Sequence, residues 1–184
     1  MAPFCAAARK VATMQVIPPF RMTPFEQVEP GDLFLYMQGG DRFYALKTQS
    51  PSVGPKTTLV MLGPSFTHDV KESFLLSWEA AVVLSLGKNF SILLPTDATA
   101  WSWSRPDRTP VWLAMAGDSL FVCTNGGPSP QQYFPCFVDV KTGQIIERAL
   151  PGTSIYTDKW EIAALGTTHP PRTILKYPLP KADN

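Results

Sequence analysis

Charged side chains are scarce in this 184-residue chain, at 17% of all residues against about 25% in an average globular protein. The net charge is only +1, and the lysines and arginines form no stripe or tail. A nucleic-acid-binding protein usually carries such a basic stripe. Nucleic acid is therefore not an expected partner. A surface with little charge tolerates contact with other protein, so a homo-oligomer and a complex with another protein both stay open.

The residues that build catalytic and metal sites are also few. There are two histidines, His68 and His169, and three cysteines, with no Cys-x-x-Cys pair and no cluster at metal-ligand spacing. No Gly-x-Ser-x-Gly nucleophile motif occurs, and the pairs Gly39-Gly40 and Gly126-Gly127 lack the helix start that follows a phosphate loop. We therefore predict no metal and no cofactor, and no catalytic residue can be assigned.

Long apolar runs are absent too, since none approaches the roughly 18 residues that a membrane helix needs. Near the N-terminus the apolar stretch Phe4–Ala8 precedes Arg9-Lys10, whereas a secretory signal carries its positive charge before a longer apolar stretch. The number of cysteines is odd. We expect a soluble, cytoplasmic protein with reduced thiols and no membrane partner.

Proline and glycine, by contrast, are abundant, with 19 and 12 residues that divide the chain into short apolar runs. This pattern favours turns and short strands over long helices. Strands are expected over residues 33–37, 43–47, 59–62, 74–86, 90–94, 111–115, 120–123, 137–141, 145–149 and 160–165. Runs such as Leu33–Met37 are apolar on both faces and must be covered on both. The predicted fold is all-β, barrel- or sandwich-like, with at most one or two short helices.

The segment from His68 to Leu86 fits two patterns. Apolar residues at a spacing of four, such as Phe74, Trp78 and Val82, suit a helix, but every second residue from Phe74 to Leu86 is also apolar, as in a strand. The alternation covers more residues. A strand is therefore preferred, and a helix over part of the segment stays open.

The prolines near both ends suggest the domain boundaries. Pro18, Pro19 and Pro24 exclude a regular helix at the N-terminus, and prolines recur after His169. We predict an irregular arm over residues 1–25, a first β lobe over 26–95, a linker with a second β lobe over 96–168, and an extended tail over 169–184. The arm and the tail are expected to contribute little to the core.

The two predicted lobes resemble copies of one unit. Gly31-Asp32 recurs as Gly117-Asp118, and Trp78-Glu79 recurs as Trp160-Glu161. The offset between matched pairs changes only across loops, where insertions are tolerated. An internal repeat is therefore predicted, although each short matched pair can also arise by chance. In a repeat, Glu79 and Glu161 are structural residues and not an acid–base pair.

Cys123 and Cys136 flank a loop rich in glycine and proline, so they could face each other in a hairpin. A redox pair or a nucleophile is one interpretation. The role that free cysteines usually have, as small buried hydrophobic residues, is favoured.

The most unusual segment runs from Trp101 to Trp112. On an extended chain Trp101, Trp103 and Arg105 share one face, and Arg108 follows closely. Tryptophan rings beside arginines stack on sugars, bases or a partner's side chains, but a tryptophan between two lobes also closes a core. Packing is favoured for at least one ring. The candidate ligand- or partner-binding residues are Trp101, Trp103, Arg105 and Arg108.

These features favour a non-enzymatic binding or assembly module that acts through protein or small-ligand contacts. One alternative is a hydrolase whose histidine, carboxylate and thiol or hydroxyl groups are gathered only by the fold; a deep polar pocket would favour it. A second alternative is a β domain that binds carbohydrate or single-stranded nucleic acid on the Trp/Arg segment. A flat apolar patch centred on tryptophan would favour the module.

Overall fold

The computed structural model describes residues 20–38, 41–49, 59–62, 75–76, 82–104, 112–126, 134–147, 149–150, 152–165 and 172–177. These residues form short antiparallel strands in three sheets, together with two short 3-10 helices, η1 (Phe25–Gln27) and η2 (Ala98–Ala100). The all-β prediction is confirmed, and a sandwich-like packing of sheets fits what is described.

Sheet A holds six strands in the order β1-β6-β2-β3-β4-β5. Its strands are β1 (Arg21–Pro24), β2 (Leu33–Gln38), β3 (Asp41–Lys47), β4 (Leu59–Met61), β5 (Leu75–Leu76) and β6 (Val82–Gly87). Consecutive residues of β2 enter different clusters. Leu33 lies in the main core, and Phe34 packs with Phe25 of η1 in a second cluster. A strand that is apolar on both faces is thus covered on both, as its sequence requires.

Sheet B holds five strands in the order β11-β10-β9-β8-β12. Its strands are β8 (Trp112–Ala116), β9 (Ser119–Gly126), β10 (Phe134–Asp139), β11 (Ile145–Glu147) and β12 (Ser154–Thr157). Val122 and Val138 point into the main core, whereas their neighbours Phe121 and Phe137 form a third cluster on the opposite face. The strict alternation of these buried residues fixes the register of the β9–β10 hairpin.

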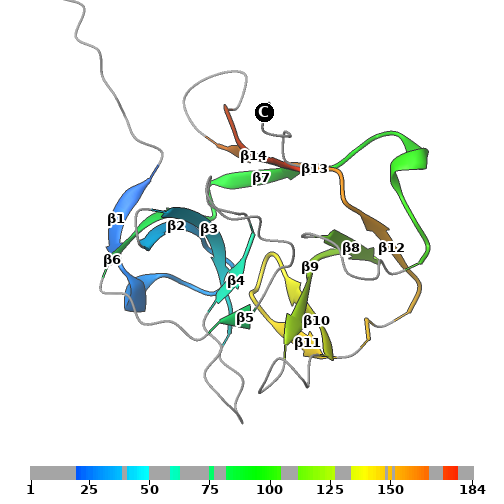
Figure 1. The fold of residues 1–184 in the computed structure, drawn as a ribbon, viewed down its shortest axis with the longest axis horizontal. Coiled ribbons are helices and arrows are strands. Elements are labelled where there is room, and N and C mark those ends of the chain that lie inside the picture. Colours follow the sequence, from blue (N-terminus) through cyan, green and yellow to red (C-terminus); the bar gives the residue numbers. More distant parts are fainter. Residues whose placement is uncertain are drawn as a thin grey trace, which may run out of the picture.

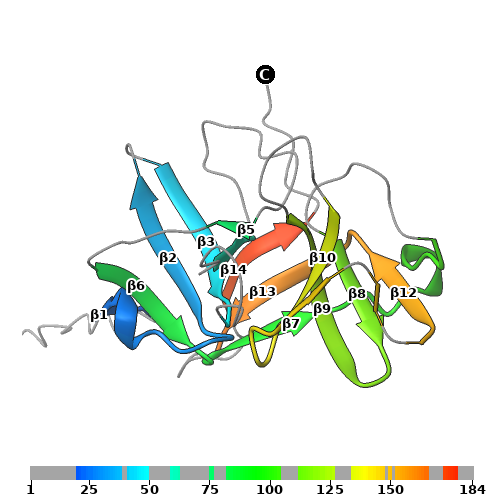
Figure 2. The same cartoon turned by 90° about the horizontal axis from the view of Figure 1, so that it is seen from below.

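Sheet C has three strands in the order β14-β13-β7, and it joins the other two sheets. Its strands are β7 (Phe90–Leu93), β13 (Trp160–Ala164) and β14 (Arg172–Tyr177). Sheets A and B lie side by side, and sheet C extends across both of them (Figures 1 and 2). The main core lies where the three sheets meet, because all three contribute fully or largely buried side chains to one cluster: Leu33, Leu46, Leu113, Val122, Ile162 and Leu175.

The predicted strand over residues 74–86 is wrong as a single element. Leu75–Leu76 forms β5 and Val82–Gly87 forms β6, and these two strands stand near opposite ends of the order of sheet A. The alternating apolar pattern therefore continues through a change of strand. Residues 68–74 and 77–81 lie outside the described part of the chain, so the alternative of a helix over part of this segment is not tested.

The arm and tail differ from the sequence-based expectation. Arg21–Pro24, inside the predicted arm, forms β1, and Arg172–Tyr177, inside the predicted tail, forms β14. Leu175 and Tyr177 of β14 are 8% and 3% exposed and belong to the main core. The tail prediction failed because flanking prolines limit a strand's length but do not stop it from pairing at a sheet edge.

The two predicted lobes also share a sheet. β7 comes from the range of the first lobe, β13 comes from the range of the second, and they pair in sheet C from Phe90 opposite Ala164 to Leu93 opposite Glu161. The predicted internal repeat is not decided by these strands. Trp78, one half of its tryptophan match, lies outside the described residues.

Candidate functional site

The predicted site residues divide into two groups. Trp101 and Trp103 are described, in the connection that leaves sheet C after β7 and reaches the outer edge of sheet B (Figure 1). Arg105 and Arg108 lie outside the described residues. The described part of the candidate site therefore consists of the two tryptophans and the elements that hold them.

The chain before Trp101 is fixed by local hydrogen bonds. Asp97 caps η2: one of its carboxylate oxygens accepts from the backbone N–H of Thr99 at 2.9 Å, and the other accepts from the Thr99 hydroxyl at 2.6 Å. These hydrogen bonds lower the pKa of Asp97, which keeps its carboxylate ionised. Asp97 thus acts as a helix cap.

The chain after Trp101 is fastened to β12. The backbone N–H and C=O of Ser102 both bond to Tyr156, at 2.8 Å each, which makes a single antiparallel bridge at the edge of sheet B. The Ser102 hydroxyl oxygen then accepts from the backbone N–H of Ser104 at 3.1 Å. Trp103 is therefore presented by a backbone that is bonded on both of its sides.

The two tryptophans have different environments. Trp101 is half-buried, and its indole Nε1–H donates to the backbone carbonyl of Pro95 at 3.2 Å. Trp103 is 75% exposed, more than any other described aromatic side chain. Trp101 thus packs against the protein while Trp103 projects into solvent. The sequence places Trp101 and Trp103 on the same face of an extended chain and therefore does not reveal this difference in exposure.

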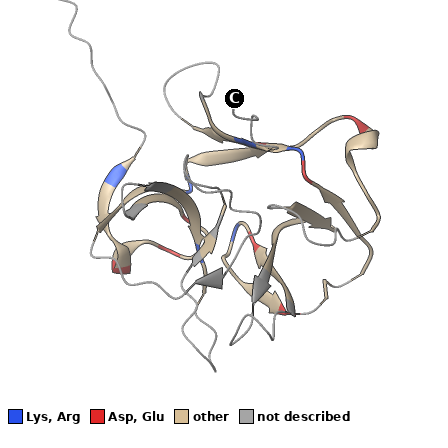
Figure 3. Ribbon diagram, in the orientation of Figure 1, with Lys and Arg blue, Asp and Glu red and all other residues tan. Residues whose placement is uncertain are grey.

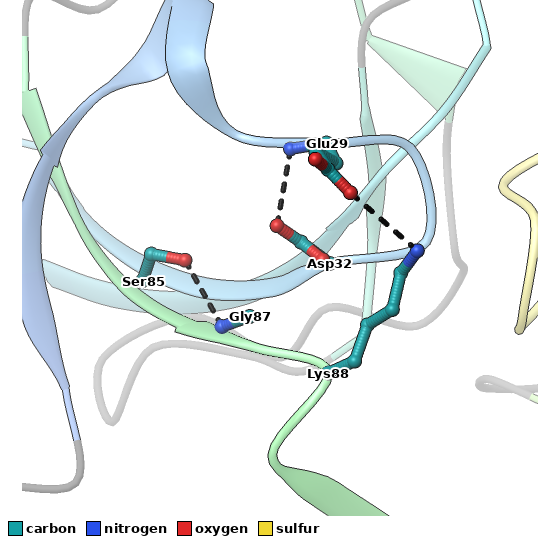
Figure 4. Close-up of polar contacts among 5 residues, drawn as sticks. All are labelled: Glu29, Asp32, Ser85, Gly87 and Lys88. Carbon is teal, nitrogen blue, oxygen red and sulfur yellow. Dashed lines mark hydrogen bonds and ion pairs between the residues drawn. The ribbon is translucent and has the colours of Figure 1, made fainter.

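A second polar cluster surrounds the turn before β2 and was not predicted as a site. Glu29 to Asp32 form a type II turn, with Pro30 at its second position, Gly31 at φ +82° and a 3.0 Å bond from the Asp32 N–H to the Glu29 carbonyl. The Asp32 carboxylate accepts from the Glu29 N–H at 3.0 Å, and Lys88 lies 3.7 Å from the Glu29 carboxylate (Figure 4). The sequence Glu-Pro-Gly-Asp signals this turn.

Asp32 and Lys47 carry shifted pKa values in this cluster. Burial raises the pKa of the Asp32 carboxyl above its ordinary value, against the opposing effects of the Glu29 hydrogen bond and of Lys88. Burial also lowers the pKa of Lys47, whose Nζ donates to the Phe25 carbonyl at 2.7 Å and lies 4.1 Å from the centre of its ring. Shifted pairs of this kind occur in catalytic sites. Here each group bonds to the backbone, so the cluster is a structural support for η1 and β2.

The cysteine pair does not face across its hairpin. Cys123 pairs with Phe137, and Cys136 pairs with Thr124, in the register of β9 and β10. Because neighbouring residues of a strand point to opposite faces, the two sulfurs project from opposite faces of sheet B. The hypothesis of a redox pair is therefore wrong, since a disulfide needs the two Cβ atoms to point toward each other.

The remaining catalytic candidates are not gathered in the described part of the chain. Glu161 of β13 pairs with Lys176 of β14 and accepts from the Thr173 hydroxyl at 3.1 Å, and these contacts lower its pKa. This is a cross-strand surface pair. His68, His169 and Glu79 lie outside the described residues.

Among the residues that the structure describes, no group of three or more His, Cys, Asp or Glu side chains could hold a metal ion. In the same residues, no helix is long and apolar enough to cross a membrane. Comparison of the chain with known protein families, curated proteins and solved structures finds no match.

Proposed function

We propose that this protein is a non-enzymatic binding or assembly module and that Trp103 is its principal contact residue. The observation that carries the proposal is the combination of 75% exposure with a bonded backbone on both sides of the residue. An exposed indole leaves a large apolar surface in water, which disfavours the free state. Contact with a partner removes that surface from water, and tryptophan is among the residues most enriched at binding hot spots.

The rigid presentation strengthens the proposal. Binding normally costs free energy because side chains and loops lose freedom at the interface. Ser102 is bridged to Tyr156, Ser104 bonds back to Ser102, and Trp101 is held by Pro95, so the backbone around Trp103 is already ordered. A contact made through this ring avoids much of the ordering cost. An indole on an untethered loop would gain less on binding.

The two alternatives receive less support. A hydrolase needs a nucleophile, a base and an orienting group within reach of one another. In the described ranges Cys123 and Cys136 project from opposite faces of sheet B, and Glu161 pairs with Lys176. For single-stranded nucleic acid, an aromatic platform is normally joined to a basic groove. The charged residues drawn in Figure 3 are sparse and mixed in sign, and the net charge is +1. A carbohydrate that stacks on Trp103 remains the second candidate because the exposed indole suits it equally.

Site-specific photocrosslinking in cells tests the proposed function. Trp103 is replaced by the photoreactive residue p-benzoylphenylalanine, and Met22, which is 78% exposed on β1 of the other large sheet, receives the same replacement as a matched control. We expect a discrete crosslinked species from position 103 only, identified by mass spectrometry. Equal labelling at both positions, or none at position 103, would contradict a macromolecular partner. Glycan-array binding that is lost in Trp103→Ala would instead support the carbohydrate.

A further inference from the structure

The last two residues of β9 are the dipeptide Asn125-Gly126. On one side, the pairing of β9 with β8 reaches only as far as Cys123, which lies opposite Trp112. On the other side, the pairing with β10 continues to Gly126 opposite Phe134, the last pair of that ladder. Within the described strands, the dipeptide is therefore held to sheet B from one side only and at the end of a ladder.

We propose that Asn125 is a site of spontaneous deamidation, with water as the co-reactant. The backbone nitrogen of Gly126 attacks the side-chain amide carbon of Asn125, a carbon–nitrogen bond forms, and the amide nitrogen leaves with the Gly126 proton as ammonia. The product of this step is a five-membered imide. Water then opens the ring at either carbonyl, which leaves an aspartate or an isoaspartate at position 125.

The residue that follows an asparagine controls the rate of this ring closure. The attacking backbone nitrogen must approach the amide carbon, and a side chain on the same residue obstructs that approach. Gly126 has no Cβ, and glycine reaches backbone conformations that other residues avoid. Asparagine is already among the residues that limit the chemical lifetime of a protein, and the glycine makes this asparagine more reactive.

The position in the fold gives Asn125 little protection. A paired strand slows the reaction, because the ring closes only after the backbone leaves its extended conformation. At Asn125 this requires the opening of one further pair, Gly126 with Phe134, and that pair has a neighbouring pair on one side only. Local opening at the end of an element costs much less free energy than global unfolding. The reactive conformation is therefore reached while the rest of sheet B stays folded.

Asn89 offers a contrast within the same chain. Its backbone is bonded in both directions: the N–H donates to the Leu86 carbonyl at 3.2 Å, and the carbonyl accepts from the Leu165 N–H at 2.9 Å. The next residue is Phe90, whose side chain obstructs the attacking nitrogen. Deamidation is therefore expected at Asn125 and not at Asn89.

The reaction changes both the charge and the backbone of sheet B. It adds one negative charge, which takes the formal net charge from +1 to zero (+1 − 1 = 0). A protein with a net charge near zero associates and precipitates more readily. An isoaspartate also lengthens the main chain by one carbon, so Gly126 no longer keeps its register opposite Phe134.

Peptide mapping by mass spectrometry tests this inference after long incubation of the folded full chain in mildly alkaline buffer. We expect product at position 125, seen as the mass gain from replacing NH2 by OH and as a separately eluting isoaspartate peptide, while Asn89 stays intact. Gly126→Ala should slow the reaction severalfold, because the added Cβ obstructs the attacking nitrogen. Asn125→Gln should prevent it over the same period, because the longer side chain would have to form a six-membered ring. Circular dichroism verifies that each variant folds.

The same chain unfolded in guanidinium chloride gives the reference rate. We expect the folded chain to convert Asn125 within about tenfold of that rate, which corresponds to about 1.4 kcal/mol for opening the terminal pair. Retention of Asn125 in the folded chain while the unfolded chain converts fully overturns the inference, as does equal conversion of Asn89. A Gly126→Ala variant that reacts as fast as wild type also overturns it. None of these outcomes bears on the binding role of Trp103, which photocrosslinking tests separately.

Discussion

Gly31 and Gly143 pack turn against turn and join sheets A and B. The Gly31 N–H donates to the carbonyl of Lys47, the last residue of β3, at 2.8 Å, and the Gly143 carbonyl accepts from the N–H of Gln49, two residues after β3, at 2.8 Å. A side-chain carbon on Gly143 would lie 2.5 Å from the Lys47 carbonyl oxygen and 2.8 Å from the Gly31 nitrogen. A side-chain carbon on Gly31 would collide with the Lys141 carbonyl.

The first prediction is that Gly31→Ala and Gly143→Ala each destabilise the protein strongly. Both glycines adopt positive φ, +82° and +69°, which costs another residue about 1–2 kcal/mol, and overpacking against fixed backbone adds about 1–3 kcal/mol. Urea denaturation should show a loss of about 2–5 kcal/mol in each variant. Gly117→Ala is the control, because Gly117 has φ +59° but nothing within 4 Å of the added carbon. An equal loss in all three variants would show that the close packing is unimportant.

The second prediction concerns pH and the buried carboxyl of Asp32. Because burial raises its pKa, the folded state holds the proton more tightly than the unfolded state, and this group's contribution to stability falls as pH rises through the folded-state pKa. Asp32→Asn keeps an acceptor for the Glu29 N–H but removes the charge. It should therefore be more stable than wild type at neutral pH, with an advantage that shrinks on acidification.

Denaturation curves at a series of pH values, from neutral to mildly acidic, measure this difference. Glu29→Gln in the same turn is the matched control. The Glu29 side chain is 73% exposed, and removing a surface ion pair should change stability by less than about 1 kcal/mol. An Asp32→Asn variant that is less stable than wild type at neutral pH would mean that the charge itself is needed there.

The third prediction is that β14 is part of the folding unit. Tyr177 is 3% exposed, and its ring stacks on Trp160 with the ring centres 4.7 Å apart. Tyr177→Ala should cost about 3–5 kcal/mol, as for other buried aromatic side chains. The Tyr177 hydroxyl is buried without a hydrogen-bond partner in the described structure, so Tyr177→Phe should be neutral or slightly stabilising.

Thermal and chemical denaturation of the two Tyr177 variants separate these effects. If Tyr177→Ala is as stable as wild type, β14 is not part of the folding unit. A clear loss in Tyr177→Phe would instead show that the hydroxyl makes a bond in solution.

The sequence predicted the strands that carry their own apolar signal. β2, β3, β4, β7, β8, β9, β10, β11 and β13 all overlap runs named from hydrophobic pattern and turn residues. β1, β12 and β14 were missed for a common reason. They are short or flanked by proline, and β12, with the sequence Ser-Ile-Tyr-Thr, is half polar. Their pairing depends on a neighbouring strand in the folded sheet, which a local pattern does not contain.

The candidate site was predictable only in part. Two tryptophans at alternate positions, Trp101 and Trp103, identified the segment, but the sequence did not show which ring would be buried. That choice depends on Pro95, which accepts from the Trp101 indole, and on Tyr156, which bonds to the Ser102 backbone. Tyr156 lies 53 positions beyond Trp103 in the chain (156 − 103 = 53). Contacts at such separations arise from the fold. Sequence spacing alone therefore could not tell which of the two indoles is exposed.

The last prediction separates the two tryptophans by their roles. Trp101 is half-buried and donates to Pro95, so Trp101→Ala should cost about 2–3 kcal/mol, less than the 3–5 kcal/mol of a fully buried ring. Trp103→Ala removes a side chain that is 75% exposed, and it should change the free energy of unfolding by no more than about 0.5 kcal/mol. Fluorescence gives an independent measurement. In dilute solution, Trp103→Phe should remove a red-shifted component that acrylamide quenches readily, and Trp101→Phe should remove a less accessible one. If Trp103→Ala destabilises the fold as much as Trp101→Ala does, Trp103 is a packing residue, and the binding role argued for it is lost.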